Sequence, residues 1–197
     1  ANLFHHQKVG FASCIRDQRI RLLTNAGAFI TYEGAHYFKN TRSWTDFRLF
    51  YSAENACNFE WQLGDRVSKS DQLKAKNQLG VWKWEGNFPG SEFINLKFPE
   101  SENLVLYGAT LESGPGIYID NFSIRGNSGG PLKQLRPDFI RQFDAQQQYD
   151  MVVLQVGLNA VTNSLNNIRW KQAELERTFK QLRECIPDKT SLNDSDR

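Results

Sequence analysis

The chain has 197 residues and a formal net charge of +2, from 24 basic and 22 acidic side chains. This length suits one ordinary domain or two small ones, and a content of 40% apolar and 23% charged residues is that of a folded chain. Up to residue 118 there are 13 basic and 12 acidic residues, and after it 11 and 10, so neither part has the basic surface that a nucleic-acid partner requires. No apolar run reaches the roughly 18 residues that a membrane span needs, so we expect no span.

The cysteines and histidines do not form a metal-binding pattern. Cys14, Cys57 and Cys185 are too far apart in sequence for a CxxC pair, and at most one disulfide could form among them. His5 and His6 are adjacent, and adjacent side chains of a strand point to opposite faces, so they would seldom share a metal ion. The sequence therefore predicts no metal site.

Residues 1–116 have the pattern of a β-sandwich. In the segment CNFEWQL, Phe59, Trp61 and Leu63 would share one face with Cys57, and polar residues alternate with them. Glycine, proline and asparagine separate several such segments, and many short strands at this spacing are typical of a sandwich. The predicted strands are Arg19–Leu23, Ala28–Glu33, Phe47–Ser52, Cys57–Leu63, Gly80–Glu85, Glu92–Phe98 and Asn103–Tyr107, with no element assigned to the polar residues 68–78.

Residues 117–197 have the pattern of an α/β domain. Leu135, Phe139 and Phe143 recur every fourth residue and predict an amphipathic helix, and a second helix would end before Pro187. MVVLQV is a continuous apolar run of the kind buried in a parallel sheet. The predicted order is strand, helix, strand, helix, over 117–125, 134–147, 151–156 and 164–185, which favours a right-handed βαβ crossover.

The loops after the two predicted strands carry groups suited to stabilise a negative charge. In open α/β sheets, ligands bind beyond the carboxyl ends of the strands, where RGNSGGP (125–131) and GLNAVTN (157–163) would lie. Glycine lets a backbone N–H approach a reacting centre closely and asparagine adds a side-chain amide, so the loops could form an oxyanion hole. The alternative is that both are tight strand-to-helix turns, in which glycine serves only the backbone angles.

The segments IDNFSIRGNSGGPL and DMVVLQVGLNAVTN resemble the middle of an SGNH (GDSL-type) hydrolase. The string from Gly126 through Asn127 and Ser128 to Gly129 fits the G-x-S-G block of that family. Gly157-Leu158-Asn159 fits the next block, G-x-N-D or G-x-N-E, although Ala160 stands where the family has an acidic residue. The resemblance implies a three-layer, flavodoxin-like α/β domain for 117–197, in which the Gly129 N–H and the Asn159 side-chain amide are oxyanion donors.

The segment LVLYGATLESGPGIYIDNFSIRGNSG is similar to a junction in some bacterial peptidoglycan and polysaccharide O-acetylesterases. There a sandwich like a carbohydrate-binding module precedes the Gly block. The resemblance implies a jelly-roll-like sandwich over 1–116 and the hydrolysis or transfer of an acyl ester on a cell-envelope or extracellular polysaccharide. It also implies a periplasmic or secreted location and a reaction that needs no cofactor.

Two blocks of that family are missing from the sequence. There is no Gly-Asp-Ser after an apolar strand and no Asp-x-x-His, and the histidines are at positions 5, 6 and 36. A serine nucleophile needs a base within hydrogen-bond reach. Three explanations are open: the chain is an internal fragment of a longer enzyme, a non-catalytic relative, or one of two chains that complete the site together. The first is favoured because both missing blocks would lie beyond the ends.

Other patterns support rival interpretations. Ser128 lies in GNSGGP, which resembles the nucleophile loop of serine proteases, and His36 precedes it as in chymotrypsin-like enzymes; the α/β pattern that follows speaks against that fold. Trp82 and Trp84 would place two rings on one face of a strand, where they could stack on a sugar or belong to the sandwich core. The alternative to an esterase is a carbohydrate-binding or scaffold module without activity, which predicts that the face with Trp82 and Trp84 is exposed and that Asn159 contacts nothing reactive.

Overall fold

The computed structural model describes residues 20–21, 28–34, 42–65, 67–85, 90–99, 103–120, 134–154 and 165–186. The chain divides into two compact units, Ala1–Phe122 and Ser123–Arg197. The first unit contains the β-strands and the second the helices. The predicted boundary between residues 116 and 117 stays a prediction.

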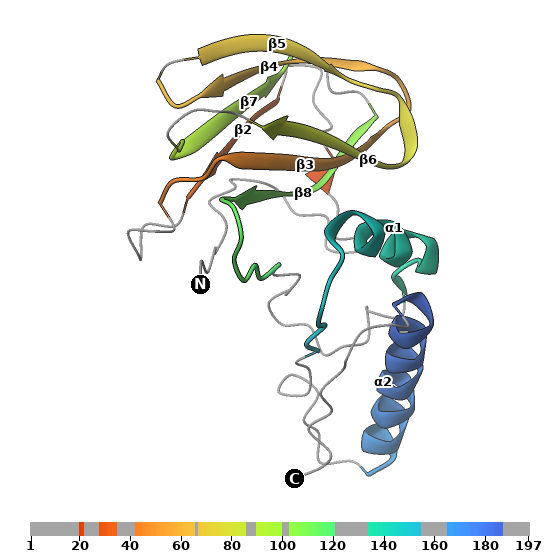
Figure 1. Ribbon diagram of the computed structural model, residues 1–197. Coiled ribbons are helices and arrows are strands. Elements are labelled where there is room, and N and C mark those ends of the chain that lie inside the picture. Colours follow the sequence, from red (N-terminus) through yellow and green to blue (C-terminus); the bar gives the residue numbers. More distant parts are fainter. Residues whose placement is uncertain are drawn as a thin grey trace. The chain divides into compact units, whose positions relative to one another are not determined.

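Eight strands of the first unit form two antiparallel four-stranded sheets (Figure 1). One sheet has the order β1-β8-β3-β6 and the other β2-β7-β4-β5, so that most consecutive strands alternate between the sheets. This alternation is the strand order of a jelly roll. The strands are β1 (Ile20–Arg21), β2 (Ala28–Glu33), β3 (Asp46–Ala53), β4 (Cys57–Leu63), β5 (Val67–Leu73), β6 (Lys76–Glu85), β7 (Phe93–Phe98) and β8 (Leu104–Glu112).

One hydrophobic core is shared by the inner faces of both sheets. In β4 the predicted alternation is confirmed, since Cys57, Phe59, Trp61 and Leu63 are buried and the residues between them are exposed. Across the core, the rings of Phe59 in β4 and Trp82 in β6 meet edge to face, with centroids 5.1 Å apart. The two sheets therefore pack face to face, as the sequence predicts for a sandwich.

A glycine in β6 makes room for a tyrosine of the neighbouring strand. A Cβ atom at Gly80 would lie 2.7 Å from Cζ of Tyr51, whose ring is buried in the core. We expect Gly80→Ala to lower the free energy of unfolding by about 1–3 kcal/mol, because the added methyl overpacks this contact. Urea unfolding measures the change. Gly116→Ala is the control, because its Cβ would meet nothing closer than 3.8 Å; an equal effect of both variants would contradict the prediction.

The second unit contains two helices, α1 (Pro137–Gln147) and α2 (Leu165–Cys185), close to the predicted ranges. The first begins three residues later than predicted because Pro137 occupies its first turn, where a missing N–H costs nothing. Its C-cap is Gln148, which has a left-handed backbone and donates its N–H to the Asp144 carbonyl. The helices contact each other, and Gln181 Nε2 of α2 donates a hydrogen bond to the Leu135 carbonyl.

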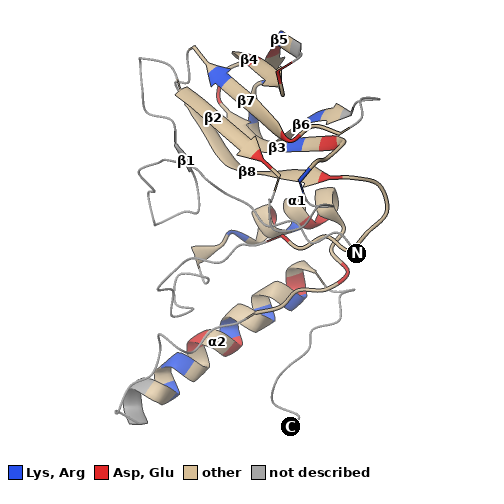
Figure 2. Cartoon of the chain, turned by 90° about the vertical axis from the view of Figure 1, so that its left-hand side faces the viewer, with Lys and Arg blue, Asp and Glu red and all other residues tan. Residues whose placement is uncertain are grey.

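Neither described helix is long and apolar enough to cross a membrane. Along α2, basic and acidic residues are interspersed (Figure 2). Glu174 and Thr178 are buried, so this face of α2 is covered, and the Thr178 hydroxyl donates to the Glu174 carbonyl one turn earlier.

The strands predicted at 117–125 and 151–156 are not strands in their described parts, 117–120 and 151–154. Val153, in the run expected to be buried, is 73% exposed, and Ile117 is 62% exposed. An apolar run predicts a buried parallel strand only if neighbouring strands pair with it and helices cover both faces. Within the described residues of the second unit no named strand is present to provide that pairing. The α/β domain of the SGNH type stays a prediction.

Candidate functional site

The residues of the predicted oxyanion hole and its loops lie outside the described residues. Their roles therefore stay predictions from the sequence. They are Gly126, Asn127, Ser128, Gly129, Gly157 and Asn159.

Trp82 and Trp84 lie on the inner face of β6 and are half-buried. Both follow the predicted two-residue spacing and share one face of the strand, beside the core. The Trp82 ring packs edge to face against Phe59, and the Trp84 ring lies 6.3 Å from that of Trp61. The positions of both indoles are therefore fixed by core aromatics. Only the exposed part of each ring could stack on a sugar, and that role stays a prediction.

Trp82 is also hydrogen-bonded to the edge of the opposite sheet. Its indole Nε1 donates to Oδ2 of Asp71 over 2.8 Å, and Asp71 is exposed on β5. Because β5 and β6 are edge strands of different sheets, this bond joins the two sheets along one edge of the sandwich. Lys69, two residues before Asp71, lies beside Trp61 in the ladder with β4.

These side chains form what we call the β5–β6 edge: Lys69, Asp71, Trp82 and Trp84. It combines aromatic surface with a carboxylate acceptor and an ammonium donor, which suits hydrogen bonding and stacking rather than bond cleavage. Sequence reasoning missed Asp71 and Lys69, since they lie in the polar segment to which it assigned no element. The pairing of β5 with β4 places Lys69 opposite Trp61, and the hydrogen bond from the Trp82 indole brings Asp71 to β6.

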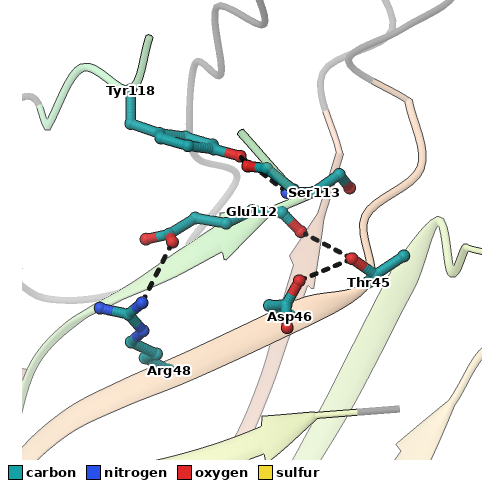
Figure 3. A network of polar contacts seen from close by, with 7 residues as sticks. Thr45, Asp46, Arg48, Glu112, Ser113 and Tyr118 are labelled. Carbon is teal, nitrogen blue, oxygen red and sulfur yellow. Dashed lines mark hydrogen bonds and ion pairs between the residues drawn. The ribbon is translucent and has the colours of Figure 1, made fainter. Parts of the chain in front are cut away.

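A polar network ties together the ends of β3 and β8 (Figure 3). Arg48 of β3 forms an ion pair with Glu112 of β8, with 3.3 Å between Nη2 and Oε2. Before β3, the Thr45 hydroxyl donates to Oδ2 of Asp46 over 2.6 Å, and the Thr45 backbone N–H donates to the Glu112 carbonyl. These groups satisfy one another, so the network is structural.

The same end of the sandwich holds the chain as it leaves β8 (Figure 3). The Tyr118 hydroxyl accepts a hydrogen bond from the Ser113 N–H over 3.1 Å and donates one to the Gly114 carbonyl. The Tyr118 ring packs against the core. This tyrosine therefore closes the turn after β8 and keeps residues up to 118 with the first unit.

Burial raises the pKa of Tyr32 in β2 well above the usual value of tyrosine. The unfolded chain ionises this phenol near pH 10, while the folded chain keeps it protonated. The stability it contributes is therefore fully present below about pH 10 and falls as the pH rises above it. Urea unfolding between about pH 9 and 11 measures this fall. We expect Tyr32→Phe to make it shallower, and an unchanged slope in that variant would contradict the assignment.

The described residues include no group of three or more His, Cys, Asp or Glu side chains placed to hold a metal ion. The side chains of Cys57 and Cys185 are both buried.

A scan against models of known protein families finds no match, and a search of curated proteins finds none. Among solved structures, the salicylyl-acyltransferase SsfX3 from a tetracycline biosynthetic pathway is 14% identical, with 89% of this chain and 74% of that one covered and a TM-score of 0.31. A family two carbohydrate esterase from Clostridium thermocellum, in complex with cellohexaose, is 11% identical over 89% of this chain and 75% of its own, with a TM-score of 0.32. A family two carbohydrate esterase from Cellvibrio japonicus is 10% identical over 91% and 76%, with a TM-score of 0.29. The weak structural neighbours of this chain thus include an acyltransferase and carbohydrate esterases, and at these scores they show neither its family nor its activity.

Proposed function

We propose that the chain is part of a serine ester hydrolase of the SGNH type, acting on acyl or acetyl esters of a cell-envelope or extracellular polysaccharide. The observation that carries the proposal is the order of its parts. Eight strands in jelly-roll order end at Glu112, and the blocks Gly126–Gly129 and Gly157–Asn159 follow in the sequence. This is the order in which the O-acetylesterases that the sequence resembles carry their sandwich and their oxyanion residues.

In this proposal the chain supplies the oxyanion hole. A serine attacks the ester carbonyl, the alcohol of the polysaccharide leaves, and water or another acceptor then takes the acyl group from the serine. The Gly129 N–H and the Asn159 amide donate to the oxygen that becomes negative in the transition state. Gly126, Asn127, Ser128 and Gly157 shape the two loops. The reaction requires no metal ion and no organic cofactor.

The nucleophilic serine and the Asp-x-x-His block are proposed to come from outside these 197 residues. The proposed sandwich function is to hold the polysaccharide, with the exposed parts of Trp82 and Trp84 and the carboxylate of Asp71 as contacts at the β5–β6 edge. A substrate of this kind places the protein in the periplasm or outside the cell.

The test combines the intact mass of the protein isolated from its source with hydrolysis of p-nitrophenyl acetate. A natural mass well above 22.7 kDa, with an active natural protein and an inactive 197-residue chain, is the expected result. If the natural protein has a mass near that of the 197-residue chain and shows no activity, the esterase proposal is overturned and a binding module is favoured. Activity of the short chain that Ser128→Ala abolishes would overturn the assignment of the nucleophile.

A further inference from the structure

The outer face of the β2-β7-β4-β5 sheet carries a row of neutral polar side chains. Thr31 pairs with Asn95, Asn95 with Gln62, and Gln62 with Ser68, so each strand contributes one residue. Their neighbours along the strands, such as Ile30 and Trp61, are buried in the core, so this row faces outward. Three strand spacings give it a length of about 14 Å. We call it the polar row.

The polar row has hydrogen-bond donors and acceptors that are not used within the described part of the protein. The Thr31 hydroxyl donates to Oδ1 of Asn95 over 2.7 Å, which fixes the amide and makes its Nδ2 group the donor that remains. Within the described ranges, the side chains of Gln62 and Ser68 have no hydrogen-bond partner, and both are exposed. The row therefore offers amide and hydroxyl groups, as donors and acceptors, side by side.

The charges next to the polar row are paired with each other. Lys97 and Glu60 lie opposite each other in the adjacent row, and Lys97 Nζ donates to Glu60 Oε2 over 3.2 Å. Glu33, at the end of β2, is the one other ionisable side chain that these four strands place on this face. A surface with so little net charge matches an uncharged partner. A nucleic acid would require unpaired basic groups.

An exposed aromatic ring stands beside the polar row. Phe29 precedes Thr31 by two residues in β2, lies on the same face and is 61% exposed. A sugar ring presents hydroxyl groups at its rim and C–H groups on its faces, so it needs hydrogen-bonding side chains together with an aromatic surface. A protein partner would instead require an apolar centre, which amides and hydroxyls do not provide.

We propose that this face binds an uncharged glycan chain, which lies across the strands along the polar row. The Asn95 and Gln62 amides and the Ser68 hydroxyl bind its hydroxyl groups, and Phe29 packs on the face of one sugar unit. This site is separate from the β5–β6 edge and does not depend on the proposed esterase.

The test is calorimetric titration of the 197-residue chain with cellohexaose, mannohexaose and xylohexaose, and with heparin as an anionic glycan. We expect binding of at least one of the neutral oligosaccharides and weaker or no binding of heparin. Phe29→Ala and Gln62→Ala should each weaken that binding by about fivefold or more, the loss expected for one contact of this kind.

Two matched variants control for surface changes in general. Trp170→Ala removes an aromatic ring of α2 with the same exposed fraction as Phe29, and Gln78→Ala removes an exposed glutamine of β6 in the other sheet. Both should leave the affinity within about twofold. Absence of binding to all three neutral oligosaccharides, or tighter binding of heparin, would overturn the proposal. Binding that Trp82→Ala abolishes and Phe29→Ala leaves intact would also overturn it, since the glycan would then lie at the β5–β6 edge.

Discussion

Phe59→Ala is expected to lower the free energy of unfolding by about 3–5 kcal/mol, the cost of removing a large buried ring that leaves a cavity. Phe59 is 1% exposed and lies between the two sheets. Its ring stacks on Phe98 of β7 with centroids 5.5 Å apart and meets Trp82 of β6 edge to face. The loss therefore removes contacts within one sheet and across to the other. Urea unfolding followed by tryptophan fluorescence measures it.

The same substitution on the outer face provides the control. Phe29 in β2 belongs to the same sheet but is 61% exposed, so Phe29→Ala is expected to change the free energy of unfolding by no more than about 0.5 kcal/mol. Two similar losses would contradict the placement of Phe59 in a core shared by both sheets. A loss below about 1 kcal/mol in Phe59→Ala would contradict it as well.

The sandwich could be predicted because half-buried strands leave a two-residue pattern in the sequence. In β4 every apolar residue faces the core and every polar one faces solvent. The neighbouring strand β5 has no such pattern, because it is an edge strand in which Leu73 is buried and Lys69 and Asp71 lie on the inner side yet remain exposed. Its backbone pairing with β4 makes it a strand, and no residue pattern predicts that pairing.

In the second unit the helices could be predicted from the sequence, and the strands could not. Its helices could be predicted, because an amphipathic helix is specified by its own spacing, and Pro187 marks the end of the second one. The expected strands could not be predicted in the same way, because a parallel strand depends on neighbours that a single apolar run does not specify. Met151 and Val153 are apolar and yet more than half exposed.

The two candidate binding surfaces of the sandwich, the β5–β6 edge and the polar row, are formed by residues that only the arrangement of the strands brings together. Asp71 and Trp82 are eleven residues apart in sequence and meet only because two edge strands of different sheets face each other. Thr31 and Asn95 are 64 residues apart and become neighbours in one ladder. Neither pair has a motif. The sequence pointed instead to the glycine and asparagine blocks and to Trp82 and Trp84, because in each the local spacing is itself the signal.

Asn159→Ala is expected to lower kcat for acyl ester hydrolysis by about 10²–10³-fold, the usual cost of losing one oxyanion donor. The amide would bind the oxygen only once it carries negative charge, so KM should change little. The measurement uses the natural protein, so that the proposed serine and base are present, with p-nitrophenyl acetate as substrate. Circular dichroism shows whether the variant remains folded.

Asn163→Ala is the matched control, because this asparagine ends the same sequence segment, GLNAVTN, but lies outside the block that fits the SGNH pattern. It should retain kcat within about twofold. If both variants lose activity equally, the effect comes from the loop as a whole and Asn159 is not an oxyanion donor. If Asn159→Ala raises KM and leaves kcat intact, the amide binds the substrate in its ground state, and the SGNH assignment of this block is wrong.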